Sequence, residues 1–481
     1  MTTNSFTKSD FGNDFIWGVS TSALQTEGAH NLHGKGNSIW DVFVLQKNKI
    51  LNNDTHYIAS DFYKNYKQDI DLIKQLGIPN FRFSLSWSRI IPDGTGEINQ
   101  AGLDFYHKVI DYCLANNIEP FVTVYHWDLP QELEHKGGWA NRDILDWFRD
   151  YVAVCADAFK NKVNYWMVLN EPMVFTGAGY FLGVHAPGKK GFKNFIPAMH
   201  HAVLCQAIGY NTIKDIDPKS SVGTTFSCSY ITPNSLSSKD IVAAKRVDAL
   251  LNRLFIEPSL GLGYPINVLP FLKKVKRYTL EGDSELMKVT FDFIGIQNYT
   301  REVVAHTIFT PHLNAKIIPA DKRKVFYTAM DWEVYPKSLF EMIQKYQAYD
   351  GVKKIMVTEN GASFPDEVVD GIIQDDNRSH FIKSYLEQVL RAKQTCSKLS
   401  GYFVWSLTDN FEWTEGLKQR FGLIYIDYTS QKRTIKNSGK WYRDFLAEKG
   451  QELPAIGCCG EMEVHPKKKA NIQVHNSNII G

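Results

Sequence analysis

The sequence predicts an α/β protein built as a single (β/α)8 TIM barrel, and three observations support this prediction. Eight short apolar runs, rich in β-branched and aromatic residues, recur along the 481 residues, and helical patterns separate them. Several runs show no alternation of apolar and polar residues, which is typical of strands buried on both faces. Polar or aromatic side chains follow many of the runs at their C-terminal ends, as at the working face of such a barrel. A doubly wound open sheet is the alternative.

The predicted strands are short, and the segments between them carry apolar residues at three- and four-residue spacing. The strands lie at 15–20, 80–85, 120–125, 163–169, 222–227, 291–296, 354–357 and 402–407. The helical spacing is clearest at Tyr66, Ile70, Ile73 and Leu76, at Leu103, Tyr106, Ile110 and Cys113, and at Trp147, Tyr151 and Cys155. Segments 23–64, 173–200 and 300–333 exceed what a βα unit needs. We expect them to form long loops over the C-terminal face of the barrel.

The composition indicates one large globular domain. The chain has 54 Lys and Arg against 52 Asp and Glu, and this net charge of +2 gives no reason to expect nucleic acid or an anionic membrane as partner. We expect residues 1–450 to form the barrel domain. Residues 451–481 break the pattern, and we expect them to form a poorly ordered or surface-bound tail.

The cysteines and the N-terminal segment bear on the compartment. Four of the seven cysteines (Cys113, Cys155, Cys205 and Cys228) lie in apolar runs, where free thiols are commonly buried. We find no signal-peptide pattern and no apolar run near the roughly 18 residues that span a membrane. These features predict a reducing, cytoplasmic location. No His, Cys and Asp cluster has metal-ligand spacing, so we expect neither metal nor cofactor.

Two glutamates directly follow apolar runs that face each other across the predicted barrel. Glu171 follows the fourth run and Glu359 the seventh. Either one alone would be interpreted as a solvated loop residue or an ion-pair partner. Two carboxylates over a cavity can instead act as acid and nucleophile on an acetal. Aromatic rings and polar groups at other strand ends favour this interpretation, because together they suit a sugar; these are His126, Trp127, Trp405 and Trp413.

Six motifs occur in order along residues 11–446. They are Phe15-Ile16-Trp17-Gly18 with Gln25 and Glu27, Phe81-Arg82-Phe83-Ser84 with Trp87-Ser88-Arg89, Tyr125-His126-Trp127-Asp128-Leu129-Pro130, Asn170-Glu171-Pro172, Thr358-Glu359-Asn360-Gly361, and Trp405-Ser406-Leu407 with Glu412-Trp413. In these motifs the chain resembles glycoside hydrolase family 1, the retaining β-glucosidase family. The resemblance implies a cofactor-free exo-β-glycosidase that releases terminal β-D-glucosyl residues from β-glucosides and short oligosaccharides such as cellobiose, through a covalent glycosyl-enzyme.

The resemblance also implies a role for each site residue. Glu359 would be the nucleophile and Glu171 the general acid and then base, with Arg82 and Tyr299 contacting the nucleophile. The sugar would be bound by Gln25, His126, Trp127, Asn170, Glu412 and Trp413, with Trp405 beneath the ring and Trp332 beside the leaving group. Arg82 lies mid-strand between two phenylalanines, so its buried charge needs a partner, and we expect it to keep Glu359 ionised. The charge of Glu359 and an aromatic wall should raise the pKa of Glu171.

The chain departs from the family pattern at a few positions. Val168 stands where a Thr is usual, which predicts a missing hydrogen bond near the acid, and Gln297-Asn298-Tyr299 replaces Asn-Tyr-Tyr. Phospho-β-glycosidases place Ser, Lys and Tyr where this chain has Glu412, Gln419 and Phe421, so unphosphorylated substrates are expected.

Other functions share these residues. The chain could use the family fold as a non-catalytic carbohydrate- or protein-binding module, although such members lose one or both glutamates. β-Galactosidase, β-fucosidase and transglycosylase activities would use the same site. The sequence does not distinguish a monomer from a homo-oligomer.

Overall fold

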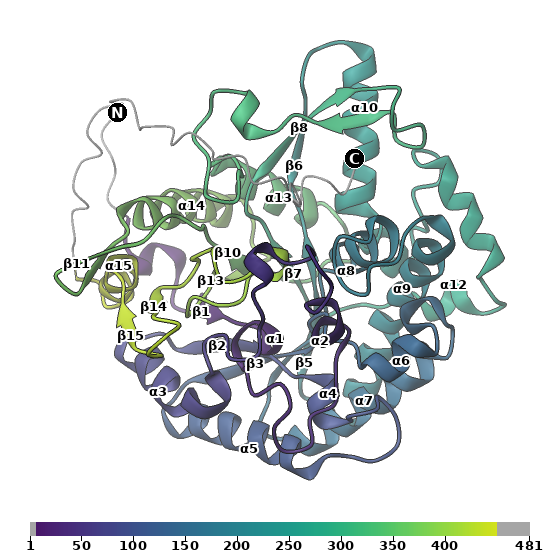
Figure 1. Ribbon diagram of the computed structural model, residues 1–481. Coiled ribbons are helices and arrows are strands. Elements are labelled where there is room, and N and C mark those ends of the chain that lie inside the picture. Colours follow the sequence, from purple (N-terminus) through teal and green to yellow (C-terminus); the bar gives the residue numbers. More distant parts are fainter. Residues whose placement is uncertain (1–5, 450–481) are drawn as a thin grey trace.

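Eight parallel strands close into a barrel in the computed structural model, which describes residues 6–449 (Figure 1). In chain order they are β1 (Ile16–Ser20), β2 (Asn80–Ser84), β3 (Glu119–Tyr125), β4 (Tyr165–Asn170), β5 (Ser221–Ser227), β7 (Phe293–Gln297), β10 (Ile355–Asn360) and β13 (Leu399–Trp405). β1 pairs with both β2 and β13, which closes the barrel. The predicted barrel is therefore confirmed, and the open sheet is wrong.

Each predicted run coincides with a barrel strand, and the strand ends differ by a few residues. The main difference is that β4 and β10 continue into the polar residues Asn170, Glu359 and Asn360. These residues are buried and paired, with register shifts in β10 before Glu359 and Asn360. An apolar run cannot predict this extension, because the last paired residues are polar.

Helices surround the strands, as Figure 1 shows. Those that follow barrel strands are α3 (Phe62–Gln75), α5 (Gln100–Ala115), α7 (Ile144–Phe159), α9 (Phe192–Ile216), α13 (Lys337–Gln347), α14 (Asp376–Thr395) and α15 (Asn437–Leu446). Between β5 and β7 lie α10 (Ser238–Asp248), α11 (Ile256–Ser259) and α12 (Asp283–Leu286). The three predicted helical patterns are confirmed in α3, α5 and α7, where Ile70, Ile110 and Tyr151 are fully buried.

An apolar cluster fills the inside of the barrel below the polar residues that end its strands. It consists of Phe121, Met167, Phe293, Met356 and Phe403. Gly18 on β1 makes room for it, since a Cβ there would lie 2.2 Å from the Phe403 ring. The cluster closes the lower barrel, so a ligand can enter only from the C-terminal end of the strands.

The segments that follow the barrel strands, among them the expected long loops, cover this end and contain regular structure. Their helices are α1 (Ala23–Thr26), α2 (Ile39–Phe43), α4 (Trp87–Ile90), α6 (Gln131–His135), α8 (Pro172–Thr176) and η4 (Gly177–Leu182). Their strands are β6 (Tyr230–Pro233), β8 (Arg301–His306), β9 (Ala315–Ile317), β11 (Glu367–Val369), β12 (Ile372–Gln374), β14 (Ile424–Ile426) and β15 (Arg433–Ile435). The short helices η1 (Lys8–Phe11), η2 (Leu51–Asn53), η3 (Gly138–Ala140), η5 (Ala249–Arg253), η6 (Pro270–Arg277), η7 (Ala320–Lys322) and η8 (Trp413–Glu415) complete the fold.

Two loop predictions need correction. α9 begins at Phe192, so the expected loop over 173–200 ends earlier than predicted. The segment 300–333 contributes β8 and β9 to a three-stranded sheet with β6. No helix among residues 6–449 is long and apolar enough to cross a membrane. The predicted tail, 451–481, lies outside the described residues.

Candidate active site

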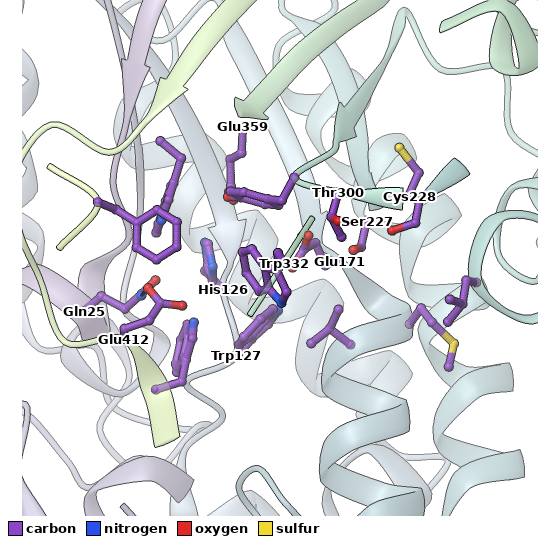
Figure 2. A pocket seen from close by; sticks show the side chains of 18 of the residues that line it. Gln25, His126, Trp127, Glu171, Ser227, Cys228, Thr300, Trp332, Glu359 and Glu412 are labelled. Carbon is purple, nitrogen blue, oxygen red and sulfur yellow. Dashed lines mark hydrogen bonds between the residues drawn. The ribbon is translucent and has the colours of Figure 1, made fainter. Parts of the chain in front are cut away.

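A pocket opens at the C-terminal face of the barrel, and the predicted site residues meet there (Figure 2). It is lined by Gln25, His126, Trp127, Glu171, Met173, Val174, Ser227, Cys228, Ser229, Leu251, Tyr299, Thr300, Glu302, Trp332, Glu359, Trp405, Glu412, Trp413 and Phe421. In Figure 2, Gln25 and Glu412 lie at one end of the pocket, and Ser227 and Cys228 lie at the other. Arg82 and Asn170 do not line the pocket. Arg82 pairs with Glu359 and Asn170 bonds to His126, and both of these partners line it.

Glu359, at the end of β10, is held by three donors. Arg82 Nη1 pairs with Oε1, Gln297 Nε2 donates to the same oxygen at 2.8 Å, and Tyr299 Oη donates to Oε2 at 2.6 Å. The partner predicted for the buried Arg82 charge is therefore present. These contacts fix the direction of the carboxylate and leave it 3% exposed at the pocket floor.

Glu171 follows β4 in an unusual backbone conformation. Its φ of 46° and ψ of 64° place it in the left-handed region, and Pro172 then starts α8. A non-glycine residue in this region carries strain of about 1–3 kcal/mol, which is seen most often at functional sites. The turn between strand and helix presents the Glu171 side chain to the pocket, beside Ser227 from the end of β5.

The two carboxyl groups have different electrostatic surroundings. Burial raises the pKa of Glu171 well above its ordinary value, the charge of Glu359 raises it further, and a hydrogen bond from Ser227 opposes the shift. Burial also raises the pKa of Glu359, although Arg82 and Tyr299 lower it. The expectation that Arg82 keeps Glu359 ionised stays a prediction: the charge of Arg82 favours the carboxylate, and desolvation opposes it. The negative charge of Glu359 favours a proton on Glu171, whereas Arg82 and Tyr299 favour the ionised form of Glu359.

Asn170 shares two hydrogen-bond donors, Arg82 and Gln297, with Glu359. Its Oδ1 accepts from Arg82 Nη2 at 2.6 Å, Gln297 Nε2 at 2.7 Å and Thr225 Oγ1 at 3.0 Å. Three donors on one atom identify that atom as the oxygen and leave the amide nitrogen facing His126 Nε2 at 3.0 Å.

The hydrogen bond with Asn170 fixes the tautomer of His126. Its Nε2 must accept from the amide, so the proton is on Nδ1. Burial and the charge of Arg82 lower the pKa of His126 well below its ordinary value, so the ring is neutral. Nδ1 has no hydrogen-bond partner among the described residues. It is therefore a buried donor available to a ligand in the pocket, whereas a core histidine would have both nitrogens satisfied.

Gln25 and Glu412 form the polar end of the pocket. Gln25, on α1, donates from Nε2 to Glu412 Oε2 at 3.3 Å and to Asn410 Oδ1 at 3.2 Å. Burial, with smaller contributions from Glu359 and Glu415, raises the pKa of Glu412 to about 8. Its carboxyl group is therefore mostly protonated at neutral pH and can both donate to and accept from hydroxyl groups.

Aromatic rings form the other walls. Trp127 and Trp413 pack with ring centroids 4.4 Å apart, and Trp40 lies 4.7 Å behind Trp413. Trp405 packs against Phe421, and Trp332 lies 5.3 Å from Tyr299. Trp332 is held by its neighbour Glu333, which forms ion pairs with Arg301 and Arg323. Trp40 is almost fully buried, as is Trp17, which packs outside the barrel against Phe445 of α15.

Sequence reasoning missed some of the lining. Ser227 ends the fifth strand and Cys228 follows it, and the polar end of that strand was a usable signal. Glu302 lies on β8, within a segment expected to be loop. Val168 needs a correction of another kind, because its side chain packs against Gly209 of α9 on the outside of the barrel. A Thr there would not reach the acid. Within residues 6–449, no group of three or more His, Cys, Asp and Glu side chains could hold a metal ion.

Comparison with known proteins gives one consistent result. The sequence profile of glycosyl hydrolase family 1 matches residues 7–451. A 1,4-β-D-glucan glucohydrolase of Thermotoga neapolitana is 40% identical over 442 residues, which cover 92% of this chain and 99% of that protein. The β-glucosidase A of Thermotoga maritima is 39% identical over 444 residues, with the same coverage. A solved structure of the family 1 β-glucosidase from Thermotoga maritima has a TM-score of 0.88 at 38% identity, covering 92% of this chain and 99% of that one.

Proposed function

The chain belongs to glycosyl hydrolase family 1 and is a glycoside hydrolase, and we propose that it removes terminal β-D-glucosyl residues with Glu359 as nucleophile and Glu171 as acid and base. The observation that carries this proposal is the pair of buried carboxyl groups in one pocket, of which Glu359 is ion-paired with Arg82 and hydrogen-bonded by Gln297 and Tyr299, whereas Glu171 lies beside Ser227. An ionised nucleophile beside a protonated acid is what the first step of a retaining reaction requires.

The reaction proceeds in two displacements. In the first, a Glu359 oxygen bonds to the anomeric carbon, the bond to the leaving oxygen breaks, and Glu171 gives its proton to that oxygen. The negative charge of Glu359 is thereby lost, which removes one cause of the raised pKa of Glu171. In the second, Glu171 takes a proton from water, the hydroxyl bonds to the anomeric carbon and the ester to Glu359 breaks.

The pocket suits a single neutral sugar. His126 Nδ1, the Gln25 amide and the Glu412 carboxyl offer donors and acceptors to hydroxyl groups, and the tryptophans offer apolar faces to the ring. The described lining contains four glutamates and neither Lys nor Arg. A sugar phosphate would find no cation to pair with, so the substrates are unphosphorylated β-glucosides and short oligosaccharides.

The same residues would serve the alternative functions. Galactosidase, fucosidase and transglycosylase activities differ in the acceptance of one hydroxyl group or of an acceptor sugar, and only product analysis separates them. The binding-module hypothesis requires an inert pocket, which the two glutamates argue against. A cytoplasmic location is part of the proposal, and the five described cysteines, all buried free thiols, are consistent with a reducing compartment.

The test is to trap the glycosyl-enzyme. The protein would be incubated with 2,4-dinitrophenyl 2-deoxy-2-fluoro-β-glucoside, and intact mass and peptide mapping would be recorded. The fluorine slows hydrolysis of the intermediate more than its formation. One fluoroglucosyl unit on the peptide that contains Glu359, absent in the Glu359→Gln variant, is the expected result. Hydrolysis of the plain aryl glucoside without any adduct would refute the nucleophile assignment or the retaining mechanism.

A further inference from the structure

A second cavity lies beside the catalytic pocket and is lined almost entirely by apolar side chains. Its volume is 220 Å³. Five phenylalanines from four separate segments line it: Phe181 on η4, Phe192 and Phe195 on α9, Phe271 on η6, and Phe309 after β8. We call it the aromatic pocket.

The rings of the aromatic pocket support one another. Phe192 lies 4.9 Å from Phe181 and 5.0 Å from Phe271, measured between ring centroids, and Phe181 lies 5.6 Å from Phe195. Contacts of this kind fix the ring positions before a ligand enters, which lowers the entropy lost on binding. Phe309, by contrast, is 87% exposed, so it stands at the mouth of the cavity.

The aromatic pocket adjoins the catalytic pocket on the leaving-group side. Met173 lines both cavities, and the consecutive residues Leu250 and Leu251 line one each. Met173 lies two residues after Glu171, which protonates the leaving oxygen in the proposed reaction. Gln25 and Glu412, which receive the sugar, lie at the opposite end (Figure 2). A methionine between two cavities is flexible enough to let a chain pass.

The chemistry of the lining selects the occupant. Among the described residues that form it, none is Asp, Glu, Lys or Arg. A second sugar would lose its hydration there without gaining comparable hydrogen bonds. An apolar group fits, because even a cavity of about 150 Å³ lined by apolar side chains binds benzene. We propose that the aromatic pocket binds an extended apolar aglycone, an alkyl chain or its equivalent, and that the natural substrates are β-glucosides of amphiphiles.

This inference rests on the proposed function, and a series of alkyl β-D-glucosides tests it. For methyl, butyl, hexyl and octyl glucosides below micelle-forming concentrations, kcat/KM should rise roughly three- to fourfold for each methylene that enters the cavity. Octyl β-D-thioglucoside, which is not hydrolysed, should inhibit at far lower concentration than methyl β-D-thioglucoside. This second measurement uses the unmodified enzyme and depends on no variant.

A charge placed in the aromatic pocket should remove the preference. Phe192 is at the first position of α9 with Lys274 Nζ 4.3 Å from its ring centre. Phe192→Asp therefore gains a favourable helix-terminus charge and a cation, so the variant should fold. The octyl-to-methyl ratio of kcat/KM should fall about tenfold or more. The matched control is Phe340→Asp, on the first turn of α13 with Arg391 over its ring at 4.5 Å and outside both cavities, and it should keep the ratio.

The outcomes separate this inference from the proposed function. If kcat/KM does not change with alkyl chain length while methyl glucoside and cellobiose are still hydrolysed, the aglycone site alone is overturned. A chain-length effect that survives in Phe192→Asp places the alkyl chain elsewhere and also overturns it. No hydrolysis of any glucoside together with no fluoroglucosyl adduct refutes the proposed function, and the inference with it.

Discussion

The side-chain amide of Gln297 donates a hydrogen bond of 2.8 Å to Oε1 of Glu359. The same nitrogen lies 2.7 Å from Asn170 Oδ1, so Gln297 joins the nucleophile to the residue that precedes the acid. Its own Oε1 has no hydrogen-bond partner among the described residues. The family usually has the shorter Asn at this position, and the longer side chain still reaches both partners.

Gln297→Leu should therefore weaken the enzyme through its nucleophile. A donor to a carboxylate favours the charged form, so its loss raises the pKa of Glu359 and moves the acidic limb of kcat/KM to higher pH. A hydrogen bond to a charged group contributes about 1.5–3 kcal/mol, which corresponds to a loss of roughly ten- to a hundredfold. The pH profile of aryl glucoside hydrolysis measures both effects.

Gln206→Leu is the control for this prediction. Gln206 is also fully buried, but it bonds to Ser259 and Thr224 outside the pocket. It should lower stability and leave the acidic limb in place. Equal pH profiles for Gln297→Leu and the unmodified enzyme would show that Gln297 does not tune Glu359.

Glu412 should lower the stability of the protein as the pH becomes alkaline. Its pKa is raised from 4.5 to about 8, so the folded state holds its proton more tightly than the unfolded chain. The sign follows: this stabilisation is complete below pH 4.5 and is lost as pH rises toward 8. The shift corresponds to at most about 5 kcal/mol. Glutamine does not ionise, so Glu412→Gln should not lose stability between pH 5 and pH 9. The Tm of this variant should therefore exceed that of the unmodified protein only slightly at pH 5 and by several degrees at pH 9.

Thermal unfolding at both pH values tests this prediction, with Glu285→Gln as the control. The Glu285 side chain is 75% exposed, and its substitution should shift Tm little at either pH. A Tm difference for Glu412→Gln that is the same at pH 5 and pH 9 would contradict the raised pKa.

Much of this site follows from the sequence, for identifiable reasons. A parallel barrel brings the C-terminal ends of all its strands to one face, so Glu171 and Glu359 could be placed together without coordinates. The side on which a residue lies is harder to predict: Met167 belongs to the cluster inside the barrel and Val168 packs outside it, and both are apolar, so the sequence does not mark the difference. Gln297 was noted as a departure from the family, but its bond to Glu359 depends on side-chain direction. The aromatic pocket joins four segments distant in sequence, and no local pattern predicts it.

Lys436 should be necessary for the loop that carries Glu412. Its Nζ pairs with Asp366 and with Asp409 Oδ1, the latter at 2.7 Å, and all three side chains are at most 1% exposed. Asp409 also accepts from the backbone of Gly422 at 3.0 Å and so holds the segment between Trp405 and Phe421. Removing one partner of a buried ion pair costs about 3–5 kcal/mol.

Lys436→Met should therefore lower the free energy of unfolding by that amount and raise KM for glucosides. Urea denaturation and steady-state kinetics would measure the two effects. Lys288→Met is the matched control, because its ion pair with Glu285 is on the surface and contributes at most about 1 kcal/mol. Similar destabilisation by both substitutions would show that the buried cluster is not specifically required.

Glu171→Ala should separate the acid role from mere proximity to the substrate. A general acid contributes about 10²- to 10⁴-fold where the leaving group needs a proton, so kcat/KM for alkyl glucosides should fall by that factor. Dinitrophenolate leaves without a proton, so kcat/KM for its glucoside should fall less than about tenfold. Without Glu171, no base removes a proton from the water that hydrolyses the glycosyl-enzyme. Azide is an anion and needs no base, so added azide should restore kcat and give β-glucosyl azide.

Glu302→Ala is the control that makes this prediction decisive. Glu302 lines the same pocket, and burial raises its pKa to about 7, so about half of these carboxyl groups carry a proton at pH 7. If Glu171 is the acid, Glu302→Ala should affect alkyl and dinitrophenyl glucosides alike and should not respond to azide. Azide rescue of Glu302→Ala, together with equal losses on both substrates in Glu171→Ala, would transfer the acid role to Glu302. The raised pKa alone cannot decide between them, because both carboxyl groups are shifted by burial; the dependence on leaving group can.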